Sequence, residues 1–325
     1  MGAKIIGSGS YLPDKCVSNL DLEQMVDTSD EWIVRRTGIS SRRLLEPGED
    51  PAKMGIAAAK LACEEARAPL ETIGLFVVAT NFPDMICPGS SPFIASGLGL
   101  DQTPFFDLKA GCSGFVYGMA IADGLIRAGL YKRILLVGSE ALSRVIDWKD
   151  RKTCVLFGDG AGAVLLEAGE ADEGVLGSAI FGDNDKALLL HMPAGGTRTP
   201  ADESTLENRG HFVKMEGAGV FRSAVPMMEK AARAALAAAS LDLKDVDWII
   251  PHQANIRIID SLGMRLGVSK ERIITNLDRV ANTSTASIPL AFDEARKDGR
   301  IKSGDIVVMT AFGAGVTYGA VVVRI

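Results

Sequence analysis

The sequence predicts an α/β fold in which one pattern of strands and helices occurs twice. Short apolar runs typical of strands buried on both faces alternate with alanine-rich stretches at helical spacing, as in 54–67 followed by 73–80. The same succession returns after a polar segment at 170–209. Alternating strands and helices form sheets covered by helices, so we expect two related halves, residues 1–170 and 171–325.

The elements of the first half follow from periodicity and from turn residues. Apolar residues at every third or fourth position indicate helices, and short apolar runs bounded by turns indicate strands. Gly38 is expected to end the first helix, because glycine often follows a last helical turn. In order, we expect a strand at 4–8, helices at 20–36 and 54–67, a strand at 73–80, a loop at 81–91, a strand at 103–106, a helix at 115–128 and a strand at 133–138.

Cys112 stands between the expected strand 103–106 and the expected helix 115–128, flanked by Gly111 and Gly114. This spacing predicts a tight turn with the thiol at a helix N-terminus, where free N–H groups and the helix dipole would stabilise a thiolate. The glycines would allow close approach of the backbone to a ligand. A buried structural cysteine would also fit this window, so both interpretations remain open at this point.

The run 157–166 is rich in glycine but is not a dinucleotide-binding motif, because a strand-like stretch follows where that motif requires a helix. We interpret its glycines as positions of close packing and a tight turn. The polar segment 170–209 is interpreted as the connection between the halves.

The second half repeats the order of elements, and residues 282–285 open a helix there as Cys112 does in the first half. The sequence separation from Cys112 to Ile134 nearly equals that from Asn282 to Ile306, which suggests a duplicated unit. The expected elements are a helix at 220–240, a strand at 246–251, a helix from 282 to 297 and a strand at 305–310.

Composition excludes several classes of protein. The 325 residues are 47% hydrophobic and carry a net charge of −6, which supports a large core and argues against general nucleic-acid binding. Five cysteines without metal-ligand spacing argue against a disulfide framework and a zinc site, and favour a reducing cytoplasm. The apolar length at the N-terminus is too short for a signal peptide, and no apolar run would span a membrane.

His252 and Asn282 join Cys112 as candidates for one site. If the halves pack about a pseudo-twofold axis, Cys112 and Asn282 open equivalent helices near that axis. His252 follows the strand 246–251, at the carboxyl end where α/β sheets place ligands. Alone, His252 could be a core or capping histidine and Asn282 an N-cap. Three polar residues at corresponding strand ends and helix starts point together to a functional site.

Trp32 lies beside Arg35 and Arg36 near the end of the expected helix 20–36. A solvated amphipathic face is one interpretation. The other is a mouth that stacks a purine on the indole and pairs phosphates with the arginines.

These residues carry a resemblance to the thiolase superfamily, and in particular to the β-ketoacyl-acyl-carrier-protein synthase III family. The similarity runs nearly from end to end in order, spacing and length. It implies a thiolase-like duplicated fold, with five αβαβα layers and two mixed sheets, and a homodimer. The motifs are AGCSGF at 110–115, GDGAG at 158–162, HQANIR at 252–257, NTS at 282–284 and AFGAGVTYG at 311–319.

The resemblance implies a decarboxylative Claisen condensation that starts type II fatty-acid synthesis. Cys112 would take the acyl group of an acyl-coenzyme A primer and then receive the enolate of malonyl-acyl-carrier protein. His252 and Asn282 would stabilise that enolate. The backbone N–H groups of Cys112 and Ala314 would form an oxyanion hole. Many relatives have glycine at the latter position, and alanine keeps the N–H. Coenzyme A is a substrate here, and no metal or further cofactor is implied.

The same resemblance assigns the binding surfaces. Trp32 and Arg151 would contact the adenine of coenzyme A, Arg36 its phosphates and Asn255 its pantetheine arm. Arg222 and Arg257 would dock the acidic carrier protein despite the net negative charge. The acyl pocket would contain Cys87, Leu142, Phe157, Leu189 and Phe312.

Cys87 bears on the choice of primer. In the family its loop reaches the pocket of the partner subunit, and some acetyl-preferring members carry a bulky aromatic there. A small residue leaves room, so we expect primers longer than acetyl to be accepted, unless neighbouring side chains refill the space.

Other chemistries remain as alternatives. Degradative thiolases need a second cysteine in the C-terminal glycine loop, which here reads Gly313-Ala314-Gly315. A condensing enzyme with a specialised primer is the nearest alternative. An acyl-binding protein or a plain acyltransferase would not need Asn282, because neither forms a malonyl enolate.

Overall fold

The computed structural model describes residues 2–170 and 172–325, and it contains two mixed β-sheets, each drawn from one half of the chain. The first sheet runs in the order β1 (Ala3–Tyr11), β7 (Asp159–Ala168), β6 (Arg133–Ala141), β4 (Leu75–Ala79) and β5 (Phe105–Leu108). The second runs in the order β8 (Gly174–Gly182), β13 (Thr317–Arg324), β12 (Ile306–Gly313) and β11 (Trp248–Pro251).

The two sheets share one pairing pattern. β1, β7 and β6 are antiparallel to one another in turn, and β6 then pairs with β4 in parallel. β8, β13, β12 and β11 repeat this succession of directions. The predicted duplication is therefore confirmed in strand order and direction. The boundary placed at residue 171 lies outside the described residues, and the division into two domains stays a prediction.

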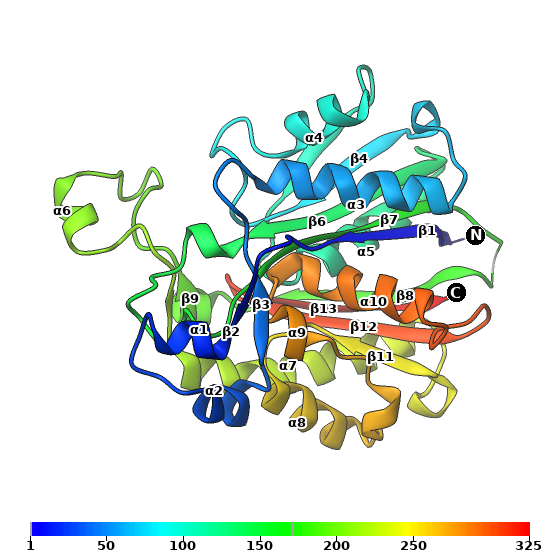
Figure 1. Ribbon diagram of the computed structural model, residues 1–325. Coiled ribbons are helices and arrows are strands. Elements are labelled where there is room, and N and C mark those ends of the chain that lie inside the picture. The colour runs from blue at the N-terminus through cyan, green and yellow to red at the C-terminus, as the bar shows by residue number, and fades with distance from the viewer. Residues whose placement is uncertain (1, 171) are drawn as a thin grey trace.

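Helices complete five layers (Figure 1). α5 (Gly114–Arg127) and α10 (Ser287–Lys297) lie between the sheets. α3 (Pro51–Glu65) and α4 (Ser91–Leu98) cover the first sheet, while α7 (Gly217–Ala238) and α8 (Ile256–Leu266) cover the second.

The middle layer joins both sheets in one apolar core. Phe115 of α5, Phe292 of α10 and strand residues such as Leu136 and Val307 belong to it, and all four are fully buried. Burying a side chain of this size stabilises the fold by about 1.5–3 kcal/mol, so this core fixes the positions of the two central helices.

The prediction of one continuous helix at 20–36 is wrong, because the chain forms two helices there, α1 (Asn19–Glu23) and α2 (Asp30–Thr37). Ser29 starts the second, because its side chain accepts a hydrogen bond from the backbone N–H of Trp32. Gly38 ends α2 as predicted, with a φ of 78°.

The segment 170–209 is more than a connection. It contains the edge strand β8, together with η3 (Asn184–Leu189), β9 (Leu190–His191) and α6 (Glu203–Glu207). β8 is only partly buried, so its sequence lacks the apolar run that marks an inner strand.

The glycine-rich run forms the strand β7, so the expected tight turn is wrong and the expected close packing is right. A Cβ added at Gly162 would lie 2.7 Å from the Cβ of Pro289 in α10. The bare backbone therefore lets the first sheet approach the middle layer.

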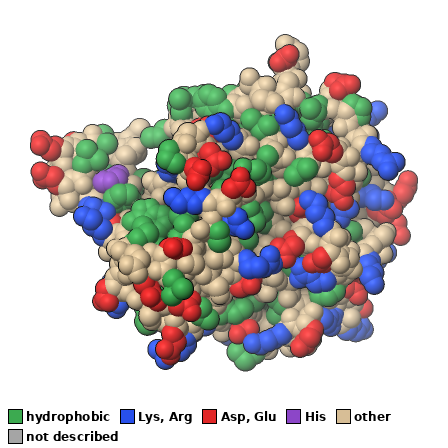
Figure 2. All heavy atoms as spheres, viewed as in Figure 1, with side chains coloured by type: hydrophobic (Ala, Val, Ile, Leu, Met, Phe, Trp, Pro, Cys, Tyr) green, Lys and Arg blue, Asp and Glu red, His purple; other side chains and the backbone are tan. Residues whose placement is uncertain are grey.

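Short elements fill the connections: β2 (Cys16–Ser18), β3 (Ser41–Arg43), β10 (Lys214–Met215), α9 (Leu277–Val280), η1 (Leu70–Thr72), η2 (Leu142–Arg144), η4 (Leu243–Asp245), η5 (Lys270–Arg272) and η6 (Ser284–Ala286). Of the helices within 2–170 and 172–325, none has the length and apolar character needed to cross a membrane. Acidic and basic side chains are interspersed over the face shown in Figure 2.

Candidate active site

Cys112 lies where the chain passes from β5 into the central helix α5, and its side chain is buried. Gly111 adopts a left-handed φ of 55°, and a Cβ added there would lie 2.4 Å from the backbone nitrogen of Ala314. A Cβ added at Gly313 would lie 2.2 Å from the backbone nitrogen of Cys112. These two glycines let the C-terminal loop lie directly against the thiol.

Burial raises the pKa of the Cys112 thiol to about 11. The Ser284 hydroxyl and the backbone N–H groups of Cys112 and Ala314 oppose that shift, and the nearby carboxyl of Glu140 adds to it. The expected stabilisation of a thiolate by the helix terminus is therefore outweighed by loss of hydration. At neutral pH the protonated thiol is the dominant form.

His252 immediately follows β11, as its position after an apolar run predicted. Its backbone N–H donates to the carbonyl of Thr310 at 2.8 Å, and Nδ1 lies 2.7 Å from Ser287 Oγ. Burial lowers the pKa of the imidazole to about 3, so the ring is neutral at physiological pH. Nδ1 is engaged by Ser287, which leaves Nε2 as the nitrogen available to a ligand.

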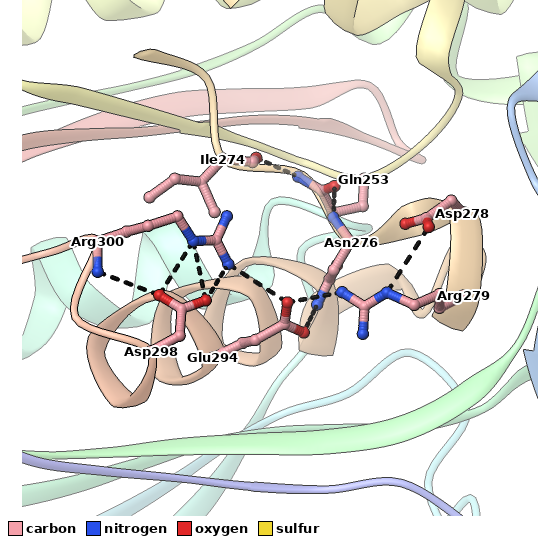
Figure 3. A network of polar contacts seen from close by, with 8 residues as sticks. All are labelled: Gln253, Ile274, Asn276, Asp278, Arg279, Glu294, Asp298 and Arg300. Carbon is pink, nitrogen blue, oxygen red and sulfur yellow. Dashed lines mark hydrogen bonds and ion pairs between the residues drawn. The ribbon is translucent and has the colours of Figure 1, made fainter. Parts of the chain in front are cut away.

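A polar network anchors the segment after His252 to α10 (Figure 3). The side chain of Gln253 donates to the carbonyls of Pro251 and Ile274 and accepts from the backbone N–H of Asn276. Asn276, Arg279 and Arg300 all donate to Glu294 of α10. Both the strand end that carries His252 and the helix that carries Ser287 are thereby held in place.

Backbone hydrogen bonds fix Asn282 to the segment 156–158, which leads into β7. Its N–H donates to Leu156 at 2.9 Å, and its carbonyl accepts from Gly158 at 3.0 Å. The side-chain Oδ1 accepts the Ser284 N–H at 2.8 Å. Asn282 thus caps the following turn through its oxygen, and its amide nitrogen remains as a donor.

The starts of the two central segments meet, as pseudo-twofold packing predicts. A Cβ added at Gly114 of α5 would lie 2.9 Å from Cγ2 of Thr285 in η6, the turn that leads into α10. Cys112, His252, Asn282 and Phe312 consequently line one cavity, which we call the inner cavity.

Two further cavities adjoin the inner one. The rear cavity is lined by Cys112, Leu142, Phe157, Ser284 and Ala314 among others, and it shares Cys112, Phe157 and Leu190 with the inner cavity. The mouth opens at the surface and shares its inner wall with the inner cavity. Residues common to the mouth and the inner cavity are Leu156, Met215, Gly217, Phe221 and Asn255.

The mouth collects every residue predicted to bind coenzyme A or the carrier protein. The guanidinium groups of Arg36 and Arg151 lie 5.1 and 5.2 Å from the centre of the Trp32 ring. The Asn255 amide donates to the carbonyl of Arg36 at 3.0 Å and so ties α8 to α2. The predicted residues that line the mouth are Trp32, Arg36, Arg151, Arg222, Asn255 and Arg257.

Comparison with known proteins identifies the family. A model described as 3-oxoacyl-[acyl-carrier-protein (ACP)] synthase III matches residues 106–184, and a model of the C-terminal part of that synthase matches residues 236–325. A β-ketoacyl-[acyl-carrier-protein] synthase III from Caldanaerobacter subterraneus subsp. tengcongensis is 45% identical over 324 residues, covering 100% of this chain and 98% of the relative. The chain belongs to the β-ketoacyl-acyl-carrier-protein synthase III family.

Solved structures agree with that assignment. The 3-oxoacyl-[acyl-carrier-protein] synthase III of Aquifex aeolicus VF5 superimposes with a TM-score of 0.92 at 41% identity, and the match covers 100% of both chains. The priming β-ketosynthase of the R1128 polyketide biosynthetic pathway gives a TM-score of 0.92 at 36% identity, over 99% of this chain and 96% of the other. The predicted thiolase-like fold and family are therefore confirmed.

The residues predicted for the acyl pocket of this synthase III chain separate into different places. Leu142 lines the rear cavity, Phe312 lines the inner cavity, and Phe157 lines both. Leu189 lines neither, and its place is taken by Leu190, which lines both. The side chain of Leu189 packs instead against α7 at Gly219.

Cys87 is exposed, in a loop where Met85 and Ile86 are also exposed. It lines neither the inner nor the rear cavity of its own chain. The contact of this loop with the acyl pocket of a partner subunit stays a prediction.

Sequence reasoning missed Glu140, Ser284 and Ser287. Glu140 lies within the mainly apolar stretch 134–142, and an acidic residue in such a stretch is the signal that could have marked it. Ser284 and Ser287 look like ordinary helix-opening residues in the sequence. Only the contacts with Cys112 and His252 reveal them.

Proposed function

We propose that this member of the synthase III family condenses an acyl-coenzyme A primer with malonyl-acyl-carrier protein and releases CO2 and a β-ketoacyl-acyl-carrier protein. The observation that carries the proposal is the meeting of Cys112, His252 and Asn282 in a cavity that continues into an arginine-lined mouth. The product would start fatty-acid synthesis.

Acylation of Cys112 is the first step. The sulfur attacks the thioester carbonyl of the primer, a new C–S bond forms, and coenzyme A leaves and takes up the thiol proton. The backbone N–H groups of Cys112 and Ala314 both act to lower the pKa of the thiol, which supports the proposal that they stabilise the negative oxygen formed beside the sulfur.

Decarboxylation and condensation follow. The bond between the malonyl carboxylate and its α-carbon breaks, CO2 leaves, and the electron pair forms an enolate. A neutral imidazole and an amide can donate to the enolate oxygen, and Nε2 of His252 and the free amide nitrogen of Asn282 meet that need. The α-carbon then attacks the acyl-Cys112 carbonyl and expels the sulfur.

The mouth would bind the thioester carriers in turn. Trp32 and Arg151 would hold the adenine, Arg36 the phosphates, and Asn255 the pantetheine arm that leads into the inner cavity. Arg222 and Arg257 would contact the acidic carrier protein, and they line the same mouth.

The rear cavity would receive the acyl chain beyond Cys112, with Leu142 and Phe157 in its wall. A homodimer would bring the Cys87 loop of one subunit to the pocket of the other. Because Cys87 is small, we propose that primers longer than acetyl are accepted. We also propose that the enzyme works in the cytoplasm.

A specialised primer is a second candidate function. The similarity to a priming β-ketosynthase of a polyketide pathway favours it, since that protein shares the fold at 36% identity. The two functions differ in the primer and not in the condensation chemistry.

One experiment tests both candidate functions. The protein is exposed to acetyl-, butyryl-, branched and longer acyl-coenzyme A thioesters, and intact-mass spectrometry records which acyl groups attach. Cys112→Ser serves as the matched control and should remain unmodified. Malonyl-carrier-dependent CO2 release from the acylated enzyme then tests the condensation. Acylation of the Cys112→Ser variant at the wild-type rate would refute the nucleophile.

A further inference from the structure

Glu140 is a completely buried carboxyl group for which the proposed condensation has no use. It lies near the end of β6, the strand beside β4 in the first sheet. Burial raises the pKa of this carboxyl to about 7. A buried acid costs stability, so its presence beside the nucleophile calls for a chemical reason.

The hydrogen bonds of Glu140 come from neutral groups. The backbone N–H and side-chain amide of Asn81 donate to Oε1 at 3.0 and 2.6 Å, and the Thr80 hydroxyl donates to Oε2 at 3.4 Å. The Thr285 hydroxyl lies 3.3 Å from Oε1 but donates over a shorter distance, 2.9 Å, to the carbonyl of Ala79. Among the described residues no charged side chain pairs with it. The titratable group that faces it is Cys112, whose pKa it raises.

Ser284 lies between the carboxyl and the thiol. Its Oγ is 3.1 Å from Oε1 of Glu140 and 3.4 Å from Sγ of Cys112. The Asn81 amide donates to the same Oγ at 3.1 Å. A hydroxyl has one proton and two lone pairs. The one hydroxyl proton of Ser284 can point to Sγ of Cys112 or to Oε1 of Glu140. When it points to Glu140, and Asn81 occupies one lone pair, the other lone pair can accept the thiol proton.

The backbone holds Ser284 in this place. Its φ is 52°, in the left-handed region, and its N–H donates to Oδ1 of Asn282 at 2.8 Å. A serine held in a sparsely populated conformation beside a nucleophile fits a functional constraint.

We propose that Glu140 and Ser284 form a proton relay that removes the thiol proton of Cys112 while the sulfur attacks the primer. This inference rests on the proposed role of Cys112. As the C–S bond forms and the carbonyl π electrons move to oxygen, the thiol proton passes to Ser284 Oγ, and the serine proton passes to the Glu140 carboxylate. The proton returns by the same path to the sulfur of the departing coenzyme A.

The arrangement keeps the groups that remove the thiol proton apart from the groups that stabilise the enolate. Ser284 reaches Cys112 from the rear cavity, whereas His252 and Asn282 line the inner cavity. The His252 imidazole is a weak base, with its pKa lowered to about 3, and it serves as a hydrogen-bond donor. The thiol pKa of about 11 exceeds that of Glu140, so the relay acts during the attack and does not form a stable thiolate beforehand.

The test is the rate of Cys112 acylation by acetyl-coenzyme A, followed by intact-mass spectrometry from pH 5.5 to 9. The wild-type rate should rise through about pH 7 as Glu140 ionises. Glu140→Gln and Ser284→Ala should each slow acylation by ~10²–10⁴ and remove that rise. Glu64→Gln is the matched control, since it makes the same change of carboxyl to amide at an exposed position of α3, and it should keep both the acylation rate and its rise with pH.

A second measurement separates the relay from a general structural effect. Enzyme loaded to completion by long incubation should condense with malonyl-carrier protein at close to the wild-type rate in both variants. Unchanged acylation rates and pH profiles in Glu140→Gln and Ser284→Ala would overturn the relay alone. If Glu140→Gln does not fold, Ser284→Ala decides the matter. A wild-type protein without an acyl group on Cys112 would overturn the proposed function together with the relay.

Discussion

Nδ1 of His252 lies 2.7 Å from Oγ of Ser287, the first residue of α10. The backbone N–H of Gln253 donates to the same Oγ at 3.4 Å, so the hydroxyl proton is free to point at Nδ1. A neutral imidazole that accepts at Nδ1 carries its proton on Nε2. The contact therefore selects the tautomer that can donate to an enolate.

Ser287→Ala should impair condensation and leave acylation of Cys112 intact, because only the enolate step uses the Nε2 proton. Loss of one oriented donor costs on the order of 10²–10³ in rate, and partial loss of orientation should cost less. Single-turnover measurements of both steps would check this. Ser287→Thr keeps the hydroxyl and should restore activity, whereas equal slowing of both steps in Ser287→Ala would contradict the assignment.

His252→Ala and Asn282→Ala should still accept an acyl group from acetyl-coenzyme A but should lose malonyl decarboxylation. Each removes a donor to the enolate oxygen, and each is expected to lower the condensation rate by ~10²–10³. Intact-mass spectrometry gives the first result and CO2 release the second. Normal condensation in both variants would refute their role.

Glu140→Gln should stabilise the protein at high pH. The folded-state pKa of about 7 lies above the ordinary glutamate value of 4.5, so the contribution of Glu140 to stability is greatest below pH 4.5 and falls as the pH rises through about 7. The free energy of unfolding falls by about 3 kcal/mol over this range, and the Glu140→Gln variant, which has no proton to lose there, should not show this fall. Denaturant unfolding at pH 5 and pH 8 should show the difference between variant and wild type growing with pH. The exposed Glu64→Gln is the control, and a pH-independent difference at Glu140 would contradict the raised pKa.

Trp32→Ala should raise KM for acyl-coenzyme A about tenfold while kcat for bound substrate changes little. The indole lies beside two guanidinium groups in the mouth, and loss of stacking and cation–π contacts costs about 1–2 kcal/mol. Steady-state kinetics at saturating malonyl-carrier protein would measure it. Leu130→Ala, at an exposed position outside the mouth, should leave KM unchanged.

Cys87→Phe should narrow the range of primers toward acetyl. In a homodimer the added ring would fill part of the pocket that receives longer chains, and overfilling a packed site costs about 1–3 kcal/mol. Comparison of acetyl- and butyryl-coenzyme A in the acylation assay would test this. Wild-type protein that reacts with acetyl but not with butyryl primer would show that Cys87 does not set the limit.

The meeting of Cys112, His252 and Asn282 in one cavity could be predicted because each stands at a junction that the sequence displays. Cys112 and Asn282 precede helical periodicity, and His252 follows an apolar run. Ser284 could not be predicted, because its contact with sulfur depends on a left-handed backbone and on the packing of η6 against β6. Leu190 was missed in favour of Leu189, because residues 188–190 are three consecutive leucines that lead into a two-residue strand, and such a run gives no alternation from which the inward side chain can be identified.

Two features of the fold could not be predicted from the sequence pattern either. One is the break between α1 and α2, and the other is the edge strand β8. A helix that stops after five residues and restarts at a serine cap keeps apolar spacing across the gap. β8 is held by pairing with β13 and not by burial of both faces. In both cases contacts that are distant or specific in geometry override the local pattern.

The close approach of Gly114 to Thr285 gives the duplicated architecture a further meaning. Under the proposed mechanism the nucleophile Cys112 belongs to one copy of the repeat and the enolate donors His252 and Asn282 to the other, so neither copy could carry the reaction by itself. A single unit would need to pair with a second one before this chemistry was available to it. Joining both units in one chain lets equivalent positions carry different groups, the thiol of Cys112 in one and the amide of Asn282 in the other.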